Sequence, residues 1–250
     1  MSTREWFKPT NIDVSPFDVS YLEEFELPQE RTAQEIESLK CIILGMPQKP
    51  RTLDIAGGFG RISSEIVKQD LVDSLVNLDL NRELLIMARR NQITNVIQGD
   101  MRYLSFLDRS FDLALMMFTT FGYFDDEDNF RVLQEVHQVL DNRGIFVLDL
   151  PNYGRISDNF IVIRKKQLKN GDTVEYRKQI EGKYLIEERV KIERDGQKKN
   201  LLPIRLRIYS PEEIVGLCQS VGFSETKITD QELKNFSPSN SRRLWVISTK

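Results

Sequence analysis

The stretch Arg51-Thr-Leu-Asp-Ile-Ala-Gly-Gly-Phe-Gly-Arg61 decides the fold of this chain. An apolar strand carries Asp54 near its end, a turn with Gly57, Gly58 and Gly60 follows, and a helix begins at once. Glycines leave the turn without Cβ atoms, so a ligand can lie directly on its backbone. The first turn of the helix adds N–H groups that have no intrahelical partner. The stretch therefore predicts a site for a nucleotide or a nucleoside-like cofactor.

The spacing of the glycines excludes two common nucleotide sites. A dinucleotide fingerprint read from Gly58 would need a third glycine where Ser63 stands, and no Gly-Lys-Ser/Thr follows the turn as a Walker loop requires. What remains is an Asp54-x-Ala56-x-Gly58-x-Gly60 pattern. It resembles the first motif of class I S-adenosylmethionine-dependent methyltransferases, with Ala56 in place of the first glycine of that motif.

Acidic residues follow the next two predicted strands. The apolar segment 74–80 carries Asp79 near its end, and the segment 96–101 carries Asp100. An acid at the end of the second strand can accept both ribose hydroxyls of a nucleoside. The resemblance places the acid after the third strand beside the adenine amino group.

The order of the later segments resembles the same family. Apolar strands are expected at 111–118, 144–151, 222–228 and 243–248, with helices before the second and third of these. The resemblance makes the last strand antiparallel. We therefore expect an α/β fold with a Rossmann-like seven-stranded sheet. A further helix is expected to begin at Thr32, with Thr32 and Glu35 as a capping box.

Residues 155–209 are expected to form an inserted antiparallel β meander of about four strands. Alternating segments are separated by turn signals at Asn170-Gly-Asp, Glu181-Gly-Lys and Arg194-Asp-Gly-Gln. We divide the chain into a methyltransferase domain over 1–154 and 210–250, whose residues 1–30 close over the cofactor, and a meander that caps the substrate. The meander holds 15 Lys and Arg against 8 Asp and Glu. This excess indicates either an anionic acceptor or an ordinary solvated sheet face.

The resemblance implies S-adenosylmethionine as the methyl donor and S-adenosylhomocysteine as the product. Arg31 is expected to pair with the carboxylate of the donor, or else to form a surface salt bridge. The residues expected to bind the cofactor are Tyr21, Arg31, Asp54, Ala56, Gly57, Gly58, Gly60, Asp79, Leu80, Asp100, Met101 and Phe118.

The residues do not identify a catalytic group. Tyr123 and Asn152 follow the fourth and fifth strands at the edge where ligands bind. Arg205, Arg207 and Tyr209 share one face of a predicted strand, which lines the pocket or meets water. His137, the single histidine of the sequence, is expected to be structural. The two cysteines lack metal-ligand spacing, so no metal is expected.

The acceptor is expected to be a small molecule methylated on N, O or C. Methyltransferases that act on nucleobase amino groups carry Asp/Asn-Pro-Pro-Tyr/Phe after the fourth strand, where this chain reads Phe118-Thr-Thr-Phe-Gly-Tyr. The net charge of −3 also disfavours a nucleic acid partner. Three alternatives stay open: a non-catalytic S-adenosylmethionine-binding regulatory or partner protein, an RNA methyltransferase that uses the basic insertion, and a nicotinamide-dependent reductase. Ser63 and the missing Tyr-x-x-x-Lys pair weaken the last of these.

The composition fits one α/β domain with an insertion. The chain has 250 residues, of which 40% are hydrophobic and 29% charged. No signal peptide is evident in residues 1–10, and the apolar runs are too short to span a membrane. Cys41 and Cys218 are expected to be reduced thiols in the core or at its edge, which indicates a cytoplasmic location. The oligomeric state is left open.

Overall fold

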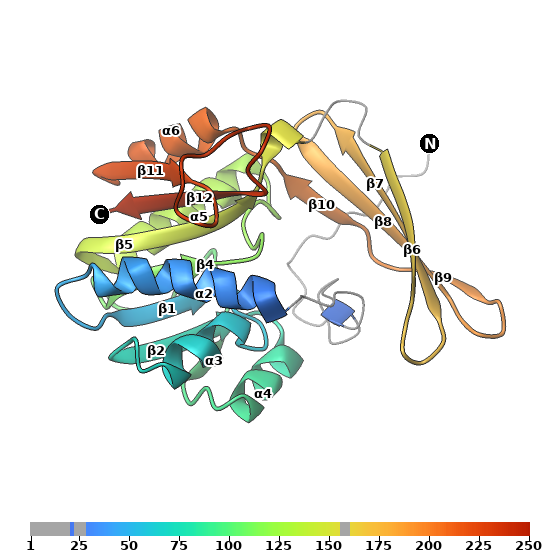
Figure 1. The fold of residues 1–250 in the computed structure, drawn as a ribbon, viewed down its shortest axis with the longest axis horizontal. Helices are drawn as coiled ribbons and strands as arrows, with labels where there is room; N and C mark the ends of the chain where they lie inside the picture. The colour runs from blue at the N-terminus through green and yellow to red at the C-terminus, as the bar shows by residue number, and fades with distance from the viewer. Residues whose placement is uncertain (1–20, 23–28, 156–160) are drawn as a thin grey trace.

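A seven-stranded sheet forms the centre of the computed structural model, which describes residues 21–22, 29–155 and 161–250 (Figure 1). Its strand order is β11-β12-β5-β4-β1-β2-β3. β12 runs antiparallel to both β5 and β11, and the other neighbours pair in parallel. The expected sheet with an antiparallel last strand is thus confirmed. The strands are β1 (Arg51–Ile55), β2 (Ser74–Asp79), β3 (Val96–Gln98), β4 (Phe111–Met116), β5 (Leu140–Pro151), β11 (Glu225–Thr229) and β12 (Arg243–Thr249).

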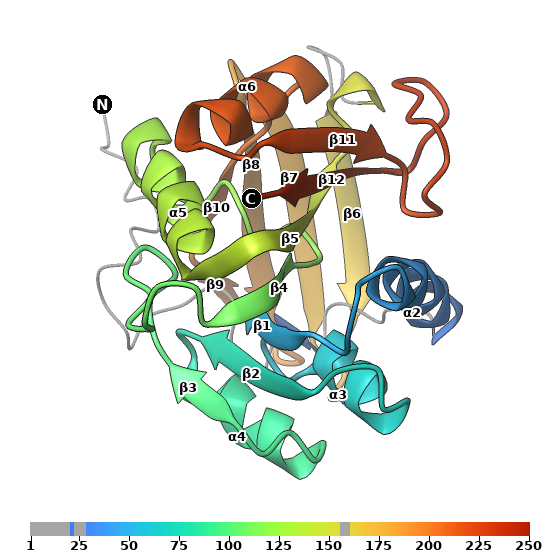
Figure 2. The ribbon, with the colours of Figure 1, turned by 90° about the vertical axis from the view of Figure 1, so that its left-hand side faces the viewer.

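Helices cover both faces of this sheet, because alternate residues of each strand point to opposite sides (Figure 2). On β4, Leu113 and Leu115 pack with one group of helices, whereas Ala114 and Met116 pack on the other side of the sheet. The first group is α2 (Gln29–Leu44), α3 (Arg61–Lys68) and α4 (Arg82–Arg90). The second is α5 (Asp126–Val139) and α6 (Pro211–Val221).

The helix starts show which sequence signals were informative. The side chain of Asn81 caps α4, and the capping box of Ser210 and Glu213 is present at α6. The capping box predicted at Thr32 is wrong, because α2 already begins at Gln29 and Thr32 lies inside it. α3 differs from α4, α5 and α6 in having no side-chain cap at its start, because it follows Gly60, so the N–H groups of its first turn remain available.

A second, antiparallel sheet is formed by the inserted segment, which the short helix η1 (Tyr153–Arg155) joins to β5. Its order is β10-β8-β7-β6, and β9 also pairs with β8. Five strands are present where about four were expected. β9 and β10 lie along the same side of β8 and are separated at Pro203, which has no N–H to donate to a ladder. The strands are β6 (Ile161–Gln167), β7 (Thr173–Glu181), β8 (Tyr184–Ile192), β9 (Lys198–Asn200) and β10 (Ile204–Arg207).

The second sheet stands opposite the carboxyl ends of the parallel strands of the first (Figure 1). In open α/β sheets, ligands bind at that edge. The insertion therefore faces the place where the sequence predicts the cofactor.

Candidate functional site

A cavity of about 1340 Å³ lies between the two sheets. The glycine turn after β1, the ends of β2 and β4, and helix α2 line one side, and side chains of β6, β7, β8 and β10 line the other. Pockets for a single drug-sized ligand have volumes of about 300–1000 Å³. This cavity is large enough for two ligands side by side.

The glycine turn is held in a shape that few other residues could adopt. Ala56, Gly58 and Gly60 have φ values of 54°, 58° and 77°, in the left-handed region. A Cβ atom on Gly57 would lie 2.2 Å from the Oδ1 of Asn77. The side chain of Asn77 also donates a hydrogen bond of 3.0 Å to the carbonyl of Gly58. The side chain of Asn77, on β2, thus holds the turn in place, and Gly57 and Gly58 line the cavity.

Two buried carboxyl groups stand beside the turn. Asp79 accepts hydrogen bonds from the backbone N–H groups of Gly58 (2.9 Å) and Asn81 (2.8 Å). Asp54 accepts a hydrogen bond of 2.5 Å from the hydroxyl of Ser63, the residue that stands where a dinucleotide site would need its third glycine. Burial raises the pKa of each carboxyl to about 6. Ligand groups that donate hydrogen bonds or carry positive charge would stabilise the ionised forms.

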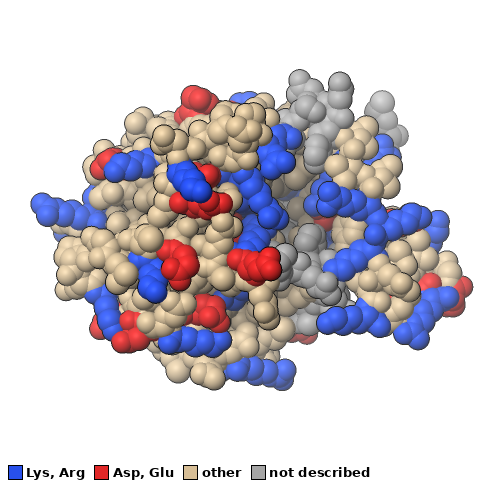
Figure 3. Space-filling view, in the orientation of Figure 1, with Lys and Arg blue, Asp and Glu red and all other residues tan. Residues whose placement is uncertain are grey.

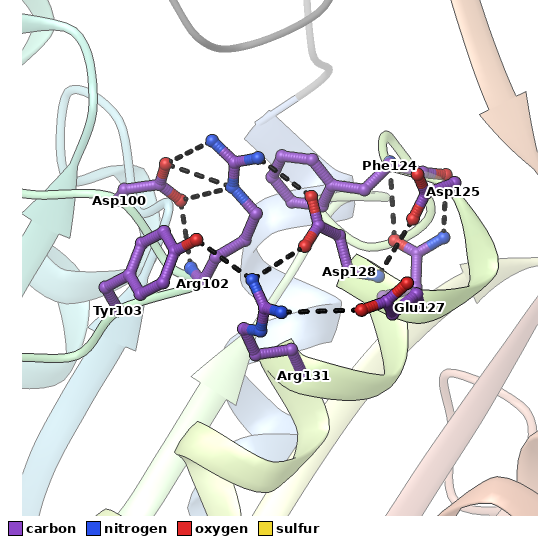
Figure 4. Close-up of polar contacts among 9 residues, drawn as sticks. Asp100, Arg102, Tyr103, Phe124, Asp125, Glu127, Asp128 and Arg131 are labelled. Atoms are coloured by element: carbon purple, nitrogen blue, oxygen red, sulfur yellow. Dashed lines mark hydrogen bonds and ion pairs between the residues drawn. The ribbon is translucent and has the colours of Figure 1, made fainter.

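Asp100 belongs to an ion-pair network after β3 (Figure 4). Its carboxylate accepts hydrogen bonds from the Nη2 (2.6 Å), Nε (3.1 Å) and backbone N–H of Arg102. Arg102 also contacts Asp128 of α5 through Nη1 (2.9 Å) and lies over the ring of Phe124, 4.6 Å from its centroid. Asp128 is held in turn by Arg131. The orientation of Asp100 is therefore set before any ligand arrives.

Arg31 of α2 also lines the cavity. Its Nε donates to the Oε1 of Glu35 at 2.9 Å, and its guanidinium lies 4.7 Å from the ring centroid of Phe118. Its Nη2 is buried and has no hydrogen-bond partner among the described residues. Glu35 also pairs with Arg61 at 2.6 Å. A buried guanidinium nitrogen without an acceptor is suited to an anionic group in the cavity.

All twelve residues expected to bind the cofactor are among those described, and eleven of them line the cavity. Tyr21 lines the cavity, and its ring centroid lies 5.0 Å from the guanidinium carbon of Arg189 on β8 of the insertion. Gly60 is not among the lining residues and forms the start of α3. The rest of the expected closing segment, residues 1–20 and 23–28, lies outside the described residues.

Comparisons with known proteins agree with this geometry. Residues 52–144 match the family model described as "Methyltransferase domain". The match runs from β1 into β5 and includes the glycine turn, Asp79 and Asp100. One similar protein is the glycine/sarcosine N-methyltransferase from Aphanothece halophytica, 28% identical over 131 residues, which cover 50% of this chain and 49% of that protein. The chain spans about half the length of the first curated relatives that it matches.

Solved structures share the fold of the methyltransferase domain together with its insertion. The methyltransferase CcbJ from Streptomyces caelestis has a TM-score of 0.76 at 15% identity and covers 97% of this chain and 98% of its own. CalS10, an amino pentose methyltransferase from Micromonospora echinaspora, has a TM-score of 0.70 at 18% identity. The match covers 96% of this chain and 99% of CalS10. At these identities the likeness shows the fold alone.

The insertion supplies the second wall of the cavity in this methyltransferase domain. Leu185, Glu187, Ile204 and Leu206 line it, and so do the basic residues Arg164 and Lys178. Lys and Arg side chains are frequent over the insertion, while both signs of charge mix over the rest of this face (Figure 3). Lys178 and Glu187 were not predicted as cavity residues, because they stand on separate strands among many other charged residues.

The sequence left open which face of β10 lines the pocket, and in the structure it is the apolar face. Ile204 and Leu206 line the cavity, whereas Arg205, Arg207 and Tyr209 do not. Arg207 is buried in ion pairs with Glu213 (3.0 Å) and Asp126 (3.1 Å). Tyr209 packs against Phe121 in the core, and the guanidinium carbon of Arg205 lies 3.5 Å from the ring centroid of Tyr184. These three side chains are therefore occupied on the side of the sheet away from the cavity.

Asn152 does not line the cavity either. Its Nδ2 donates to the carbonyls of Ser241 (2.6 Å) and Pro238 (3.0 Å), and its Oδ1 accepts from the N–H of Gly154. It therefore holds the loop before β12. Asp149, at the end of β5, is similarly engaged, because it accepts hydrogen bonds from Arg243 and from the indole of Trp245.

Tyr123 and Thr120 do line the cavity, on the segment after β4. Burial, and then the negative charge of Glu187, raise the pKa of Tyr123, so the phenol keeps its proton at neutral pH. The Oγ1 of Thr120 is buried without a hydrogen-bond partner among the described residues. These groups can donate and accept hydrogen bonds, but an ionised tyrosine is not available as a base.

The remaining candidates lie elsewhere. His137 packs edge-on against Phe223, with ring centroids 5.1 Å apart, and lies beside Gly222 at the end of α6. Cys218 is buried and Cys41 is exposed, so the expectation of a core position fails for Cys41.

Among the described residues, no group of three or more His, Cys, Asp or Glu side chains is placed to hold a metal ion. In the same part of the chain, no helix is long and apolar enough to cross a membrane.

Proposed function

We propose that the protein transfers a methyl group from S-adenosylmethionine to a small-molecule acceptor, an activity of class EC 2.1.1.-, and releases S-adenosylhomocysteine. One observation carries the proposal. A single cavity joins the glycine turn, Asp79 and Asp100 to a second wall that comes from the insertion. A methyl donor bound at the glycine turn and an acceptor bound against the insertion would meet inside the same cavity.

The residues on the first side fit the donor. The bound donor supplies a methyl group already activated on a sulfonium centre. The open glycine turn suits its methionine portion, Asp79 suits the ribose hydroxyls, and the preset Asp100 suits the adenine amino group. The Nη2 of Arg31, which has no hydrogen-bond partner among the described residues, suits the carboxylate. Asp54 and Asp79, whose pKa values burial raises, would be stabilised in their ionised forms by the cationic groups and hydroxyls of the donor.

The protein contributes alignment and the exclusion of water. Holding two reactants in line can supply roughly 7–11 kcal/mol of the barrier reduction. We propose that residues 155–209 act as the substrate cap and that residues 1–30 close over the cofactor.

The basic side chains Arg164, Lys178 and Arg242 along the cavity support an anionic group on the acceptor. The names of the similar proteins, a glycine/sarcosine N-methyltransferase and an amino pentose methyltransferase, support small acceptors. The cytoplasmic location expected from the cysteines also stays a proposal.

Calorimetric titration tests the proposal. S-adenosylhomocysteine should bind with 1:1 stoichiometry, and NADH should not bind. Binding of NADH in its place would favour the nicotinamide-dependent reductase. Binding of S-adenosylhomocysteine without methyl transfer to any small molecule, with transfer to RNA instead, would move the proposal to the RNA alternative.

A further inference from the structure

Glu187 is the acidic side chain of β8 on the cavity wall, and it is nearly fully buried, with 5% of its surface exposed. Its Oε2 pairs with Lys178 of the neighbouring strand β7. Its Oε1 is buried and accepts no hydrogen bond from any described residue. The Nε of Arg189 lies 4.0 Å from this oxygen, beyond hydrogen-bond range. A buried carboxylate oxygen without a donor costs free energy, which a hydrogen-bond donor on a bound molecule would recover.

The groups around Glu187 disfavour a hydroxyl acceptor. A hydroxyl must lose its proton to attack a methyl group, so it needs a base beside it. Tyr123 cannot serve, since burial and the charge of Glu187 raise its pKa and keep the phenol protonated. The single histidine, His137, lies against Phe223 and does not line the cavity. A carboxylate already held in an ion pair is better suited to accept a hydrogen bond than to remove the proton of a hydroxyl.

An amine removes this difficulty, because its neutral form is nucleophilic enough to attack the methyl group before it loses a proton. We propose that the acceptor presents an amino group to this wall and that Glu187 Oε1 accepts one of its N–H bonds, which directs the nitrogen lone pair at the donor. The proposal rests on the proposed methyl transfer and names its acceptor class. The nitrogen forms a bond to the methyl carbon, the carbon–sulfur bond breaks with its electron pair on sulfur, and the surplus proton of the new ammonium passes to water. Thr120, whose Oγ1 is buried and bonds to none of the residues that the structure describes, is a second polar group on the same cavity.

Glu187→Gln is the central variant, and Glu188→Gln is its matched control. Side chains alternate along a strand, so Glu188 faces the opposite side of β8, where Arg177 of β7 stands across from it. Glu187→Gln leaves Lys178 without its carboxylate partner. The side chain of Lys178 is 27% exposed, so water can solvate its charge in the variant. Glu187→Asp, which keeps the charge on a shorter side chain, guards against a folding defect of the first variant.

The assay measures S-adenosylhomocysteine formation with matched acceptors. The amines are glycine, sarcosine, histamine, D-glucosamine and D-glucosamine 6-phosphate, and the hydroxyl counterparts are glycolate, D-glucose and D-glucose 6-phosphate. We expect turnover with at least one amine and with none of the hydroxyl compounds. For that amine, Glu187→Gln should raise KM at least about tenfold, the loss of one charge-assisted hydrogen bond. The KM of Glu187→Asp should lie between those of the wild type and Glu187→Gln, and the KM of Glu188→Gln should match that of the wild type.

The outcomes separate the two proposals. Calorimetry that shows no S-adenosylhomocysteine binding to the wild type would overturn the proposed function itself. If S-adenosylhomocysteine binds but only hydroxyl compounds turn over, or no amine does, the amine inference is wrong and the donor site stands. An unchanged KM in both Glu187 variants would remove Glu187 from the acceptor site.

Discussion

Replacing Arg31 by methionine tests the carboxylate contact of the cofactor separately from the rest of the site. The side chain of Arg31 is only 14% exposed, and its Nη2 has no partner among the described residues. Methionine keeps much of the apolar contact with Phe118 and removes the charge. Glu35 is not left unpaired by the change, because it also pairs with Arg61. The fold should therefore survive.

The expected magnitude follows from the contact that is lost. A hydrogen bond to a charged group contributes about 1.5–3 kcal/mol, which corresponds to roughly a 10- to 150-fold loss of affinity. Calorimetry should show this loss for S-adenosylhomocysteine. 5′-Methylthioadenosine, which has the same nucleoside but no carboxylate, should bind the variant and the wild type alike.

The pair of ligands also gives the result that would refute the reasoning. Equal losses for both ligands would mean that Arg31 acts through the shape of the site. No loss for either would mean that Arg31 serves only its salt bridge with Glu35, the alternative that the sequence left open.

Three further predictions concern the turn and its carboxylates. Asp79→Ala should weaken S-adenosylhomocysteine binding about tenfold or more, since it removes one or two charge-assisted hydrogen bonds; unchanged calorimetry would refute the ribose contact. Gly57→Ala should lower the melting temperature by about 2–12 °C, because overpacking costs about 1–3 kcal/mol and the new Cβ would lie 2.2 Å from Asn77 Oδ1. Gly216→Ala, in open space on α6, is the control and should be neutral or stabilising; equal melting temperatures in the two variants would contradict the packing argument. Because the pKa of Asp79 is raised to about 6, its ionised form is lost as the pH falls through 6, so affinity should drop up to about tenfold between pH 7.5 and pH 5. A flat pH profile would contradict the contact with the ionised carboxylate.

The first side of the cavity was predictable because its signals are local. The glycine turn and the acids after β2 and β3 are read from short segments, and the parallel sheet brings strand ends together at one edge. Details that depend on tertiary contacts were not predictable. Arg102 orients Asp100 only because Asp128, on the distant helix α5, holds the other side of its guanidinium.

The orientation of the second wall could not be predicted from the sequence for a physical reason. Alternation along a strand separates an apolar face from a polar face, but it does not tell which face meets a cavity. Arg207 is buried on the far face because Asp126 and Glu213, both outside the insertion, neutralise it there. Ile204 and Leu206 consequently face the cavity. The pairing of Lys178 with Glu187 depends on the register of β7 against β8, which the turn signals alone do not determine.

A crystal structure of the wild-type protein with S-adenosylhomocysteine would show whether the donor lies on the glycine turn. We expect density for the homocysteine portion against Ala56–Gly60, both ribose hydroxyls within hydrogen-bond distance of Asp79, and the carboxylate at the Nη2 of Arg31. The sulfur should then face the wall that carries Glu187. Density for the ligand outside this cavity, or with its ribose away from Asp79, would contradict the account.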